Sequence, residues 1–239
     1  MIVDEDDHFL ILNKPPGWSI YPQGSSPRPA ITSWLKSHFY SDTPIRPVHR
    51  LDVETSGLLI CGKHQEVIRD LNTLFRTRSI QKRYWAICKQ RQAPHLHFSP
   101  HALTHHITIP LGFDPTSQVR IKMGRGTRSA LTTIYLKARS PQKDLVWLEV
   151  SPQTGRQHQI RVHLSLVGYP IVGDKLYGED ERFFLKAHQG FLDSSDFQIL
   201  GFPRHLLHAS RLEFTWKKKK YEWTCSWPLD IVEHFSWLA

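Results

Sequence analysis

The segment 49–52, His-Arg-Leu-Asp, places one carboxylate, Asp52, next to two basic or protonatable side chains. Thr-Ser-Gly follows at 55–57, and the apolar run at 58–61 then predicts a buried strand. An aspartate with its usual pKa near ~3.9 is charged at neutral pH, so it can act as a nucleophile or a base. A structural ion pair is the alternative, because pairing perturbs carboxylates at many sites that do no chemistry.

The spacing of apolar residues predicts the elements that must position this segment. Helical spacing covers 30–39 and 65–75, and a further helix is expected after Gly155. Strands are predicted over 9–12, 84–89, 131–136 and 145–150, and as a pair over 205–214 and 221–227 joined by the four lysines at 217–220. Strands grouped with few intervening helices favour an α+β fold with a mixed, mainly antiparallel central sheet flanked by helices.

Length and charge limit the domain organisation and the partners. With 239 residues and 40% hydrophobic content, the chain can form one domain with a large core, or at most two small ones. We expect a single catalytic domain over 1–239, with an irregular His- and Pro-rich insert at 91–106. The 31 Lys and Arg outnumber the 22 Asp and Glu, giving a net charge of +9. This balance favours a polyanionic partner, although a basic surface without one is the alternative.

The cysteines and the N-terminus predict an intracellular protein. Cys61, Cys88 and Cys225 are odd in number and far apart, which indicates buried thiols in a reducing compartment. The first ten residues are acidic, and no apolar run approaches ~18 residues. We therefore expect no signal peptide, no membrane span and a cytoplasmic location.

The sequence offers weak signals for a metal and for a dinucleotide. Five histidines lie in the segment 95–106, but they lack Cys or carboxylate companions and regular helical spacing. Gly124-Arg125-Gly126 is followed by Ser129 where a dinucleotide fingerprint needs glycine. With Arg120, Lys122 and Arg128 nearby, this stretch is better explained as a basic loop suited to a polyanionic partner. We expect neither a cofactor nor a metal.

Five blocks of the sequence together resemble the RluA-type pseudouridine synthases, from about residue 4 to about residue 228. Blocks in a fixed order are far more specific than any single short pattern. The block around Asp52 is similar to the signature of that family, and the others resemble its opening, its Lys-x-Tyr-x-Ala strand, its longest motif and its Leu-His-Ala strand. They read HRLDVETSGLLICGK (49–63), FLILNKPPGW (9–18), QKRYWAI (81–87), TGRQHQIRVHLSLVGYPIVGDKLYG (154–178) and LLHASRL (206–212).

The resemblance implies a pseudouridine synthase-like catalytic domain with a basic cleft, and it implies roles for three residues. Asp52 would be the catalytic carboxylate. Tyr84 would stack on an extruded base, with core packing as the alternative, and Trp85 would face the opposite side of its strand. Arg161 would pair with Asp52 and hold it ionised, with a solvated surface arginine as the alternative. The reaction is a rearrangement of uridine in RNA that needs no redox cofactor.

The same resemblance indicates further RNA contacts. Arg50 is a candidate to fill the stack that the base vacates, and an ion pair with Glu54 is its alternative. His49, Arg83, Arg156 and His158 are also expected to bind the substrate, which would be structured ribosomal or transfer RNA. Family members often carry an additional N-terminal RNA-binding domain, and we expect none here. We also infer no obligate protein partner.

Two other functions remain open at this point. One is a catalytically inactive RNA-binding relative, which the presence of Asp52, Tyr84 and Arg161 disfavours. The other is a metal-dependent RNA hydrolase that would use the histidines of 95–106. The sequence does not name the target uridine, the number of targets or the oligomeric state.

Overall fold

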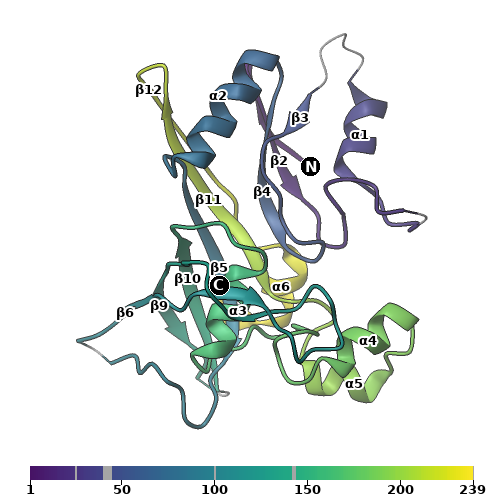
Figure 1. The fold of residues 1–239 in the computed structure, drawn as a ribbon, viewed down its shortest axis with the longest axis vertical. Coiled ribbons are helices and arrows are strands. Elements are labelled where there is room, and N and C mark those ends of the chain that lie inside the picture. Colours follow the sequence, from purple (N-terminus) through teal and green to yellow (C-terminus); the bar gives the residue numbers. More distant parts are fainter. Residues whose placement is uncertain (25, 40–44, 100, 142–143, 239) are drawn as a thin grey trace. The chain divides into compact units, whose positions relative to one another are not determined.

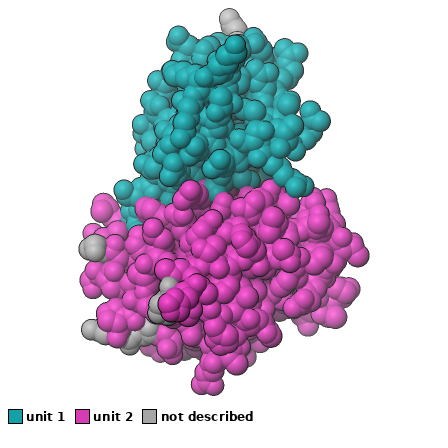
Figure 2. Space-filling view, turned by 90° about the vertical axis from the view of Figure 1, so that its left-hand side faces the viewer, with its two compact units in different colours: residues 1–82, 208–228 teal, residues 83–207, 229–239 magenta. Residues whose placement is uncertain are grey.

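The computed structural model describes residues 1–24, 26–39, 45–99, 101–141 and 144–238. The described chain divides into two compact units, coloured separately in Figure 2. Unit 1 contains residues 1–82 and 208–228, and unit 2 contains residues 83–207 and 229–239. The predicted single catalytic domain stays a prediction, and each unit is described by itself.

Unit 1 is a sheet with the strand order β1-β2-β4-β11, in which β12 pairs with β11 and β3 pairs with β4 (Figure 1). Its strand pairs are antiparallel except that β11 runs parallel to β4, with His208 opposite Ser56 and Ala209 opposite Gly57. The strands are β1 (Ile2–Glu5), β2 (Phe9–Lys14), β3 (Arg46–Pro47), β4 (Ser56–Gly62), β11 (Leu207–Trp216) and β12 (Lys219–Thr224), and the helices are α1 (Ile31–His38) and α2 (Gln65–Arg76).

Buried side chains on both faces of β2 explain why this sheet forms. Successive side chains of a strand point to opposite faces. On one face, Leu10 and Leu12 pack with the buried Ile31 and Leu35 of α1. On the other, the ring of Phe9 meets four aromatic rings of the β11–β12 hairpin at centroid distances of 5.0–6.2 Å: Phe214, Trp216, Tyr221 and Trp223. The central strand β4 is buried along its whole length.

Unit 2 is built on an antiparallel sheet with the order β5-β10-β9-β6, and a separate pair, β7-β8. Its strands are β5 (Gln81–Lys89, whose first two residues belong to unit 1), β6 (Thr104–Ile107), β7 (Leu111–Phe113), β8 (Met123–Arg125), β9 (Thr132–Arg139) and β10 (Leu145–Pro152). Its helices are α3 (Gln159–Leu166), α4 (Arg182–Gln189), α5 (Ser194–Leu200), α6 (Leu229–His234) and the 3₁₀ turn Ser236–Leu238.

The core of unit 2 forms where α3 packs beside β8, β9 and β10. Val162 of α3 contributes to this core together with Met123 and Tyr177. The six residues 159–164 of α3 are all buried, so the helix is enclosed on most of its sides, and Arg161 is buried with them.

The α+β class and the mainly antiparallel strand pairing are confirmed. The predicted helices 30–39 and 65–75 and the predicted strands agree closely with α1, α2, β2, β5, β9 and β10. The short elements β1, β3, β6, β7 and β8 and the helices α4 to α6 were not expected. The irregular insert was expected to cover 91–106, and this was wrong for its last residues. Thr104, in β6, already pairs with Tyr135 of β9.

Two local predictions were wrong. The hairpin turn contains only Lys217 and Lys218, which have φ values of 47° and 65°, because Lys219 and Lys220 pair within β12. The strand also ends at Thr224, so Cys225 lies outside it and is half-buried rather than buried. Cys61 and Cys88 are buried free thiols, as expected.

Gly57 shows how closely the backbones approach at the parallel pair of unit 1. Its φ is +106°, and an added Cβ would collide with the backbone carbonyl of Ala209. We expect Gly57→Ala to lower the free energy of unfolding by more than roughly 3 kcal/mol, because strain and a backbone clash add. Denaturant unfolding midpoints measure this loss.

Gly17→Ala is the matched control for Gly57→Ala. Gly17 also has a positive φ, +85°, but its added Cβ would have no neighbour within 4 Å. Its cost should be limited to about 1 kcal/mol of backbone strain. Equal losses in the two variants would contradict the role assigned to the close approach.

Candidate active site

Asp52 lies in a short turn between β3 and β4 of unit 1. The residue is half-buried, and its backbone carbonyl accepts a hydrogen bond from the Thr55 N–H at 3.1 Å, which closes a four-residue turn. Thr55 and Ser56, which follow the turn, are buried. The carboxylate is therefore carried by a turn whose downstream end is anchored in the core.

A buried lysine holds the same turn from the other side. Lys14, at the end of β2, has no exposed surface, and its Nζ donates to the carbonyl oxygens of Pro15, Trp18 and Val53, each at 2.9 Å. The Gly17 N–H donates to the same Val53 carbonyl at 2.8 Å. A buried charge is costly unless hydrogen bonds compensate it, and here three carbonyls do so. The ammonium thus ties the residue after Asp52 to the segment 14–18.

Sequence reasoning missed Lys14. The signal that was present is a lysine at the end of an apolar strand, directly before Pro15-Pro16-Gly17. A polar residue at that position suggests a strand end, and only the partner carbonyls show that the side chain points inward.

His49 is neutral rather than cationic. Its ring stacks on Phe75, with centroids 4.9 Å apart and planes at 27°. Burial and, secondly, the positive charge of Lys82 lower the pKa of His49 from its usual 6.5 to about 3. Its Nε2 accepts a hydrogen bond from the Ile60 N–H at 3.1 Å, so the ring proton is on Nδ1. Any contact of His49 with RNA at neutral pH therefore comes from an uncharged ring. Arg50, by contrast, is exposed.

Tyr84 and its neighbours lie on β5 in unit 2. Tyr84 is opposite Val150 of β10 and is buried, while Trp85 is half-buried and meets the Trp147 ring edge-on at 5.3 Å. Arg83 forms an ion pair with Glu149 at 2.7 Å. The expected alternation of the two rings is consistent with the strand geometry, whereas stacking of Tyr84 on a base stays a prediction.

Arg161 is a buried arginine held by a buried aspartate. Its Nε and Nη2 donate to the two carboxylate oxygens of Asp174 at 2.7 and 2.8 Å, and only 7% of Arg161 is exposed. Burial by itself would raise the pKa of Asp174, but the charge and hydrogen bonds of Arg161 outweigh it and hold that pKa well below its usual range. The alternative of a solvated surface arginine is wrong.

Tyr177 supports the same guanidinium from one face. The Arg161 guanidinium lies 5.0 Å from the Tyr177 ring centroid, a cation–π contact. The Tyr177 hydroxyl accepts the Met123 N–H at 2.9 Å and lies 2.8 Å from Nδ1 of His158. The structure thus links the predicted site residues His158 and Arg161 through Tyr177, within unit 2.

The segment before α3 is held by hydrogen bonds that involve side chains. His158 caps the helix in the left-handed conformation, with φ 53°, so the helix begins at Gln159 and not directly after Gly155. The Gln159 side chain accepts the Arg156 N–H at 3.0 Å, and the Arg156 Nε donates to the Ser129 carbonyl at 3.1 Å. Strained residues of this kind often occur at functional sites.

Sequence reasoning also missed Asp174 and Tyr177. Both lie in the block 154–178 that carries the resemblance, where they had no assigned role. Asp52, His49 and Arg50 belong to unit 1, whereas Tyr84, Arg83, Arg156, His158 and Arg161 belong to unit 2. The predicted meeting of Asp52, Tyr84 and Arg161 and the basic cleft therefore stay predictions.

The described residues contain neither a cluster of metal ligands nor a helix suited to spanning a membrane. No three His, Cys, Asp or Glu side chains among the described residues form a group that could hold a metal ion. No helix in the described part of the chain is long and apolar enough to cross a membrane.

Comparison with known proteins supplies the family. Residues 8–166 match the family described as RNA pseudouridylate synthase. This chain belongs to that family. The matched range contains Lys14, Asp52, Tyr84 and Arg161, and the resemblance drawn from the sequence blocks is confirmed.

Curated and solved pseudouridine synthases resemble the chain over most of its length. It is 31% identical over 220 residues to the ribosomal large subunit pseudouridine synthase D of Zymomonas mobilis, covering 89% of this chain and 64% of that one. It is 32% identical over 235 residues to the synthase C of Buchnera aphidicola, covering 97% and 68%. The human RNA pseudouridylate synthase domain containing 1 has a similar fold, with a TM-score of 0.73 at 24% identity over 95% of this chain and 83% of that one.

We expect Lys14→Met to destabilise the protein by about 3 kcal/mol or more, because three buried carbonyls lose their donor. Amide exchange at Thr55 should also accelerate, since the Asp52 turn loses its tie to segment 14–18. Lys63→Met is the control, because its ion pair with Glu5 is partly exposed and contributes about 1 kcal/mol or less. Similar losses in both variants would contradict the proposal that Lys14 holds the Asp52 turn.

The His49 ring should titrate near pH 3 in an NMR experiment. The unfolded ring takes up its proton near pH 6.5, so the unfolded state binds more protons below that pH. The contribution of His49 to stability therefore falls as the pH drops from about 6.5 toward about 3. The Nδ1–H tautomer should be observed at neutral pH. A midpoint near 6.5 would refute the neutral buried ring.

Proposed function

We propose that the protein isomerises uridine in structured RNA to pseudouridine, with Asp52 as the catalytic carboxylate. The observation that carries this proposal is the match of residues 8–166 to the RNA pseudouridylate synthase family, because that range contains Asp52, Tyr84 and Arg161. The net charge of +9 agrees with a polyanionic substrate.

In the proposed reaction the N1–C1′ bond of the uridine breaks, the base turns, and a C5–C1′ bond forms. C5 releases its proton and N1 takes one up, so the product is an isomer of the substrate and no electron is gained or lost. Asp52 acts on the sugar, as a nucleophile or as a base. Its place on an anchored turn supports this role, since a carboxylate held in one position needs little reorganisation when it reacts.

Arg161 is proposed to hold Asp52 ionised. Asp174 and Tyr177 already orient the guanidinium, so the cation would be presented in a fixed geometry. An arginine has five N–H donors, which is more than a single carboxylate accepts. Tyr84 is proposed to stack on the extruded base.

The substrate is proposed to be large-subunit ribosomal RNA, with transfer RNA as the alternative. The relatives from Zymomonas mobilis and Buchnera aphidicola carry ribosomal large subunit in their names, which favours the first. The chain spans only 64% and 68% of the lengths of those relatives, so their substrates come to it as a proposal. A cytoplasmic location and independence from a cofactor also stay predictions.

Asp52→Asn should abolish pseudouridine formation while leaving RNA binding largely intact, because the amide keeps the shape of the side chain without its charge. The assay is chemical mapping of pseudouridine in unmodified large-subunit ribosomal RNA and in transfer RNA, incubated with each variant. Asp7→Asn is the control, since Asp7 is exposed and belongs to the same unit.

Residual turnover by Asp52→Asn within a few-fold of wild type would remove Asp52 from the catalytic role. A wild-type protein that binds these RNAs and forms no pseudouridine would instead point to an inactive relative. RNA cleavage that a chelator prevents would favour the hydrolase.

A further inference from the structure

The helix α2 ends with an arginine where a glycine is usual. Arg78 has φ 61°, its N–H donates to the Phe75 carbonyl at 3.2 Å, and the Ser79 N–H donates to the Leu74 carbonyl at 2.9 Å. These two hydrogen bonds form a Schellman motif with Arg78 at its left-handed position. Glycine is common there because it has no Cβ, and a side chain other than that of Asn or Asp gains no local hydrogen bond in return. Local stability therefore does not explain the arginine.

The Arg78 side chain is exposed and has no protein partner in the described part of the chain. The same holds there for Arg50 and Arg76, which are also exposed. Some other cations of unit 1 form ion pairs: Lys63 with Glu5 at 2.9 Å, Lys217 with Glu66 at 3.0 Å, and Arg211 and Lys220 with Glu213 at 2.8 Å. The cations near the end of α2 thus carry charge that the protein itself does not neutralise.

These cations are organised around Phe75. The His49 ring stacks on Phe75, and the Nζ of Lys82 lies 5.9 Å from the Phe75 ring centroid. Arg50 follows His49, and Arg76 and Arg78 follow Phe75 in sequence. Arg50, Arg76, Arg78 and Lys82 form what we call the Phe75 basic cluster. Arg50 also lies two residues before Asp52, so the cluster begins at the turn that carries the proposed catalytic carboxylate.

The helix dipole does not account for Arg78. Cations near a helix C-terminus are favourable, but Arg76 already supplies one from the last turn in ordinary helical geometry. A second cation at a position that strains the backbone adds little to that effect, because the dipole falls off within the last turn. Arg78 is exposed, so its guanidinium is accessible to a ligand.

We propose that Arg78 is an RNA-binding residue that contacts backbone phosphates beside the target uridine, and that the left-handed backbone serves to present it. Where an arginine binds a phosphate, it frequently does so through two parallel N–H donors. The ligand is the phosphate backbone of the substrate RNA. The inference therefore rests on the proposed function and assigns one further residue to RNA binding.

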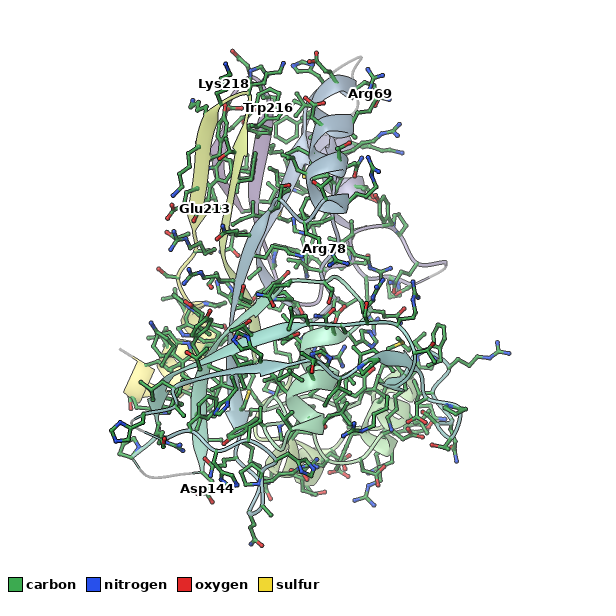
Figure 3. All side chains as sticks on the ribbon, turned by 60° about the vertical axis from the view of Figure 1, so that its left-hand side comes forward. Arg69, Arg78, Asp144, Glu213, Trp216 and Lys218 are labelled. Carbon is green, nitrogen blue, oxygen red and sulfur yellow. The ribbon has the colours of Figure 1, made fainter. Side chains whose placement is uncertain are left out.

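The chain contains a matched control for this residue. Lys218 is also exposed, basic and left-handed, with φ 65°, and it lies in the turn of the β11–β12 hairpin. Figure 3 shows Lys218 at the tip of that hairpin and Arg78 beyond the C-terminal end of α2, at the other end of unit 1. Replacing either residue with glycine removes one charge and relieves the same kind of strain.

The experiment compares Arg78→Gly, Arg78→Asn, Arg78→Lys and Lys218→Gly. The probe is unmodified bacterial large-subunit ribosomal RNA transcribed in vitro, and affinity is measured over a range of salt concentrations. Affinity for RNA falls as salt rises, and Arg78→Gly and Arg78→Asn should make this fall shallower, by roughly 0.7 to 0.9 in the slope of log affinity against log salt. At about 0.1 M salt this corresponds to a fivefold to eightfold weaker affinity. Arg78→Lys should retain the slope.

Stability provides the second readout. Arg78→Gly and Lys218→Gly should both raise the denaturant midpoint, because glycine relieves the left-handed strain. Only Arg78→Gly should also weaken RNA binding. An Arg78→Gly protein with wild-type affinity and slope would overturn the proposal. An equal loss in Lys218→Gly would overturn it too, since that would be a general effect of charge.

The outcome is separable from that of the proposed function. If wild type forms no pseudouridine while Arg78→Gly still weakens RNA binding, the RNA contact stands and the isomerase proposal fails. If pseudouridine forms and Arg78→Gly binds as wild type does, the isomerase stands and the contact fails.

Discussion

The buried ammonium of Lys14 is the interaction on which the organisation of unit 1 around Asp52 depends. Its three carbonyl partners come from the end of β2 and from the turn before β4, two segments that are far apart in sequence. A neutral side chain would leave those carbonyls without a donor in a place that water does not reach. The position of the proposed catalytic carboxylate is thus set by a charge that does not itself take part in the proposed chemistry.

In unit 2 a buried charge also positions a candidate site residue, but the signs of the charges are reversed. There the functional candidate is the cation, Arg161, and a buried carboxylate, Asp174, and an aromatic ring, Tyr177, hold it. Asp174 also accepts the N–H groups of Leu176 and Tyr177, so its own position is determined by the chain that follows it. In both units, a buried charge whose hydrogen bonds are satisfied gives one group a single orientation before any substrate arrives.

Backbone strain is found in both units next to candidate RNA contacts. His158 adopts the left-handed conformation directly before α3 and reaches Tyr177, and Arg78 adopts it directly after α2. The chain uses glycine at positions such as Gly57 and Gly17, where the backbone needs positive φ. Arg78 keeps its side chain in such a position without a partner among the described residues, which is the argument behind the role inferred for it. Lys217 and Lys218 differ, because they form a two-residue hairpin turn that requires positive φ.

The sequence by itself determined the elements with strong apolar periodicity and the α+β class, and it supplied Asp52 as the proposed catalytic carboxylate, because these depend on local spacing and on ordered motifs. It missed short strands such as β1 and β3, whose pairing comes from neighbours and not from their own residues. Only the tertiary structure decided that Lys14 points inward, that His49 is neutral and that Arg161 is bound by Asp174. Burial, pKa and ion pairing depend on partners from distant parts of the chain, and the local sequence does not show which residues those partners are.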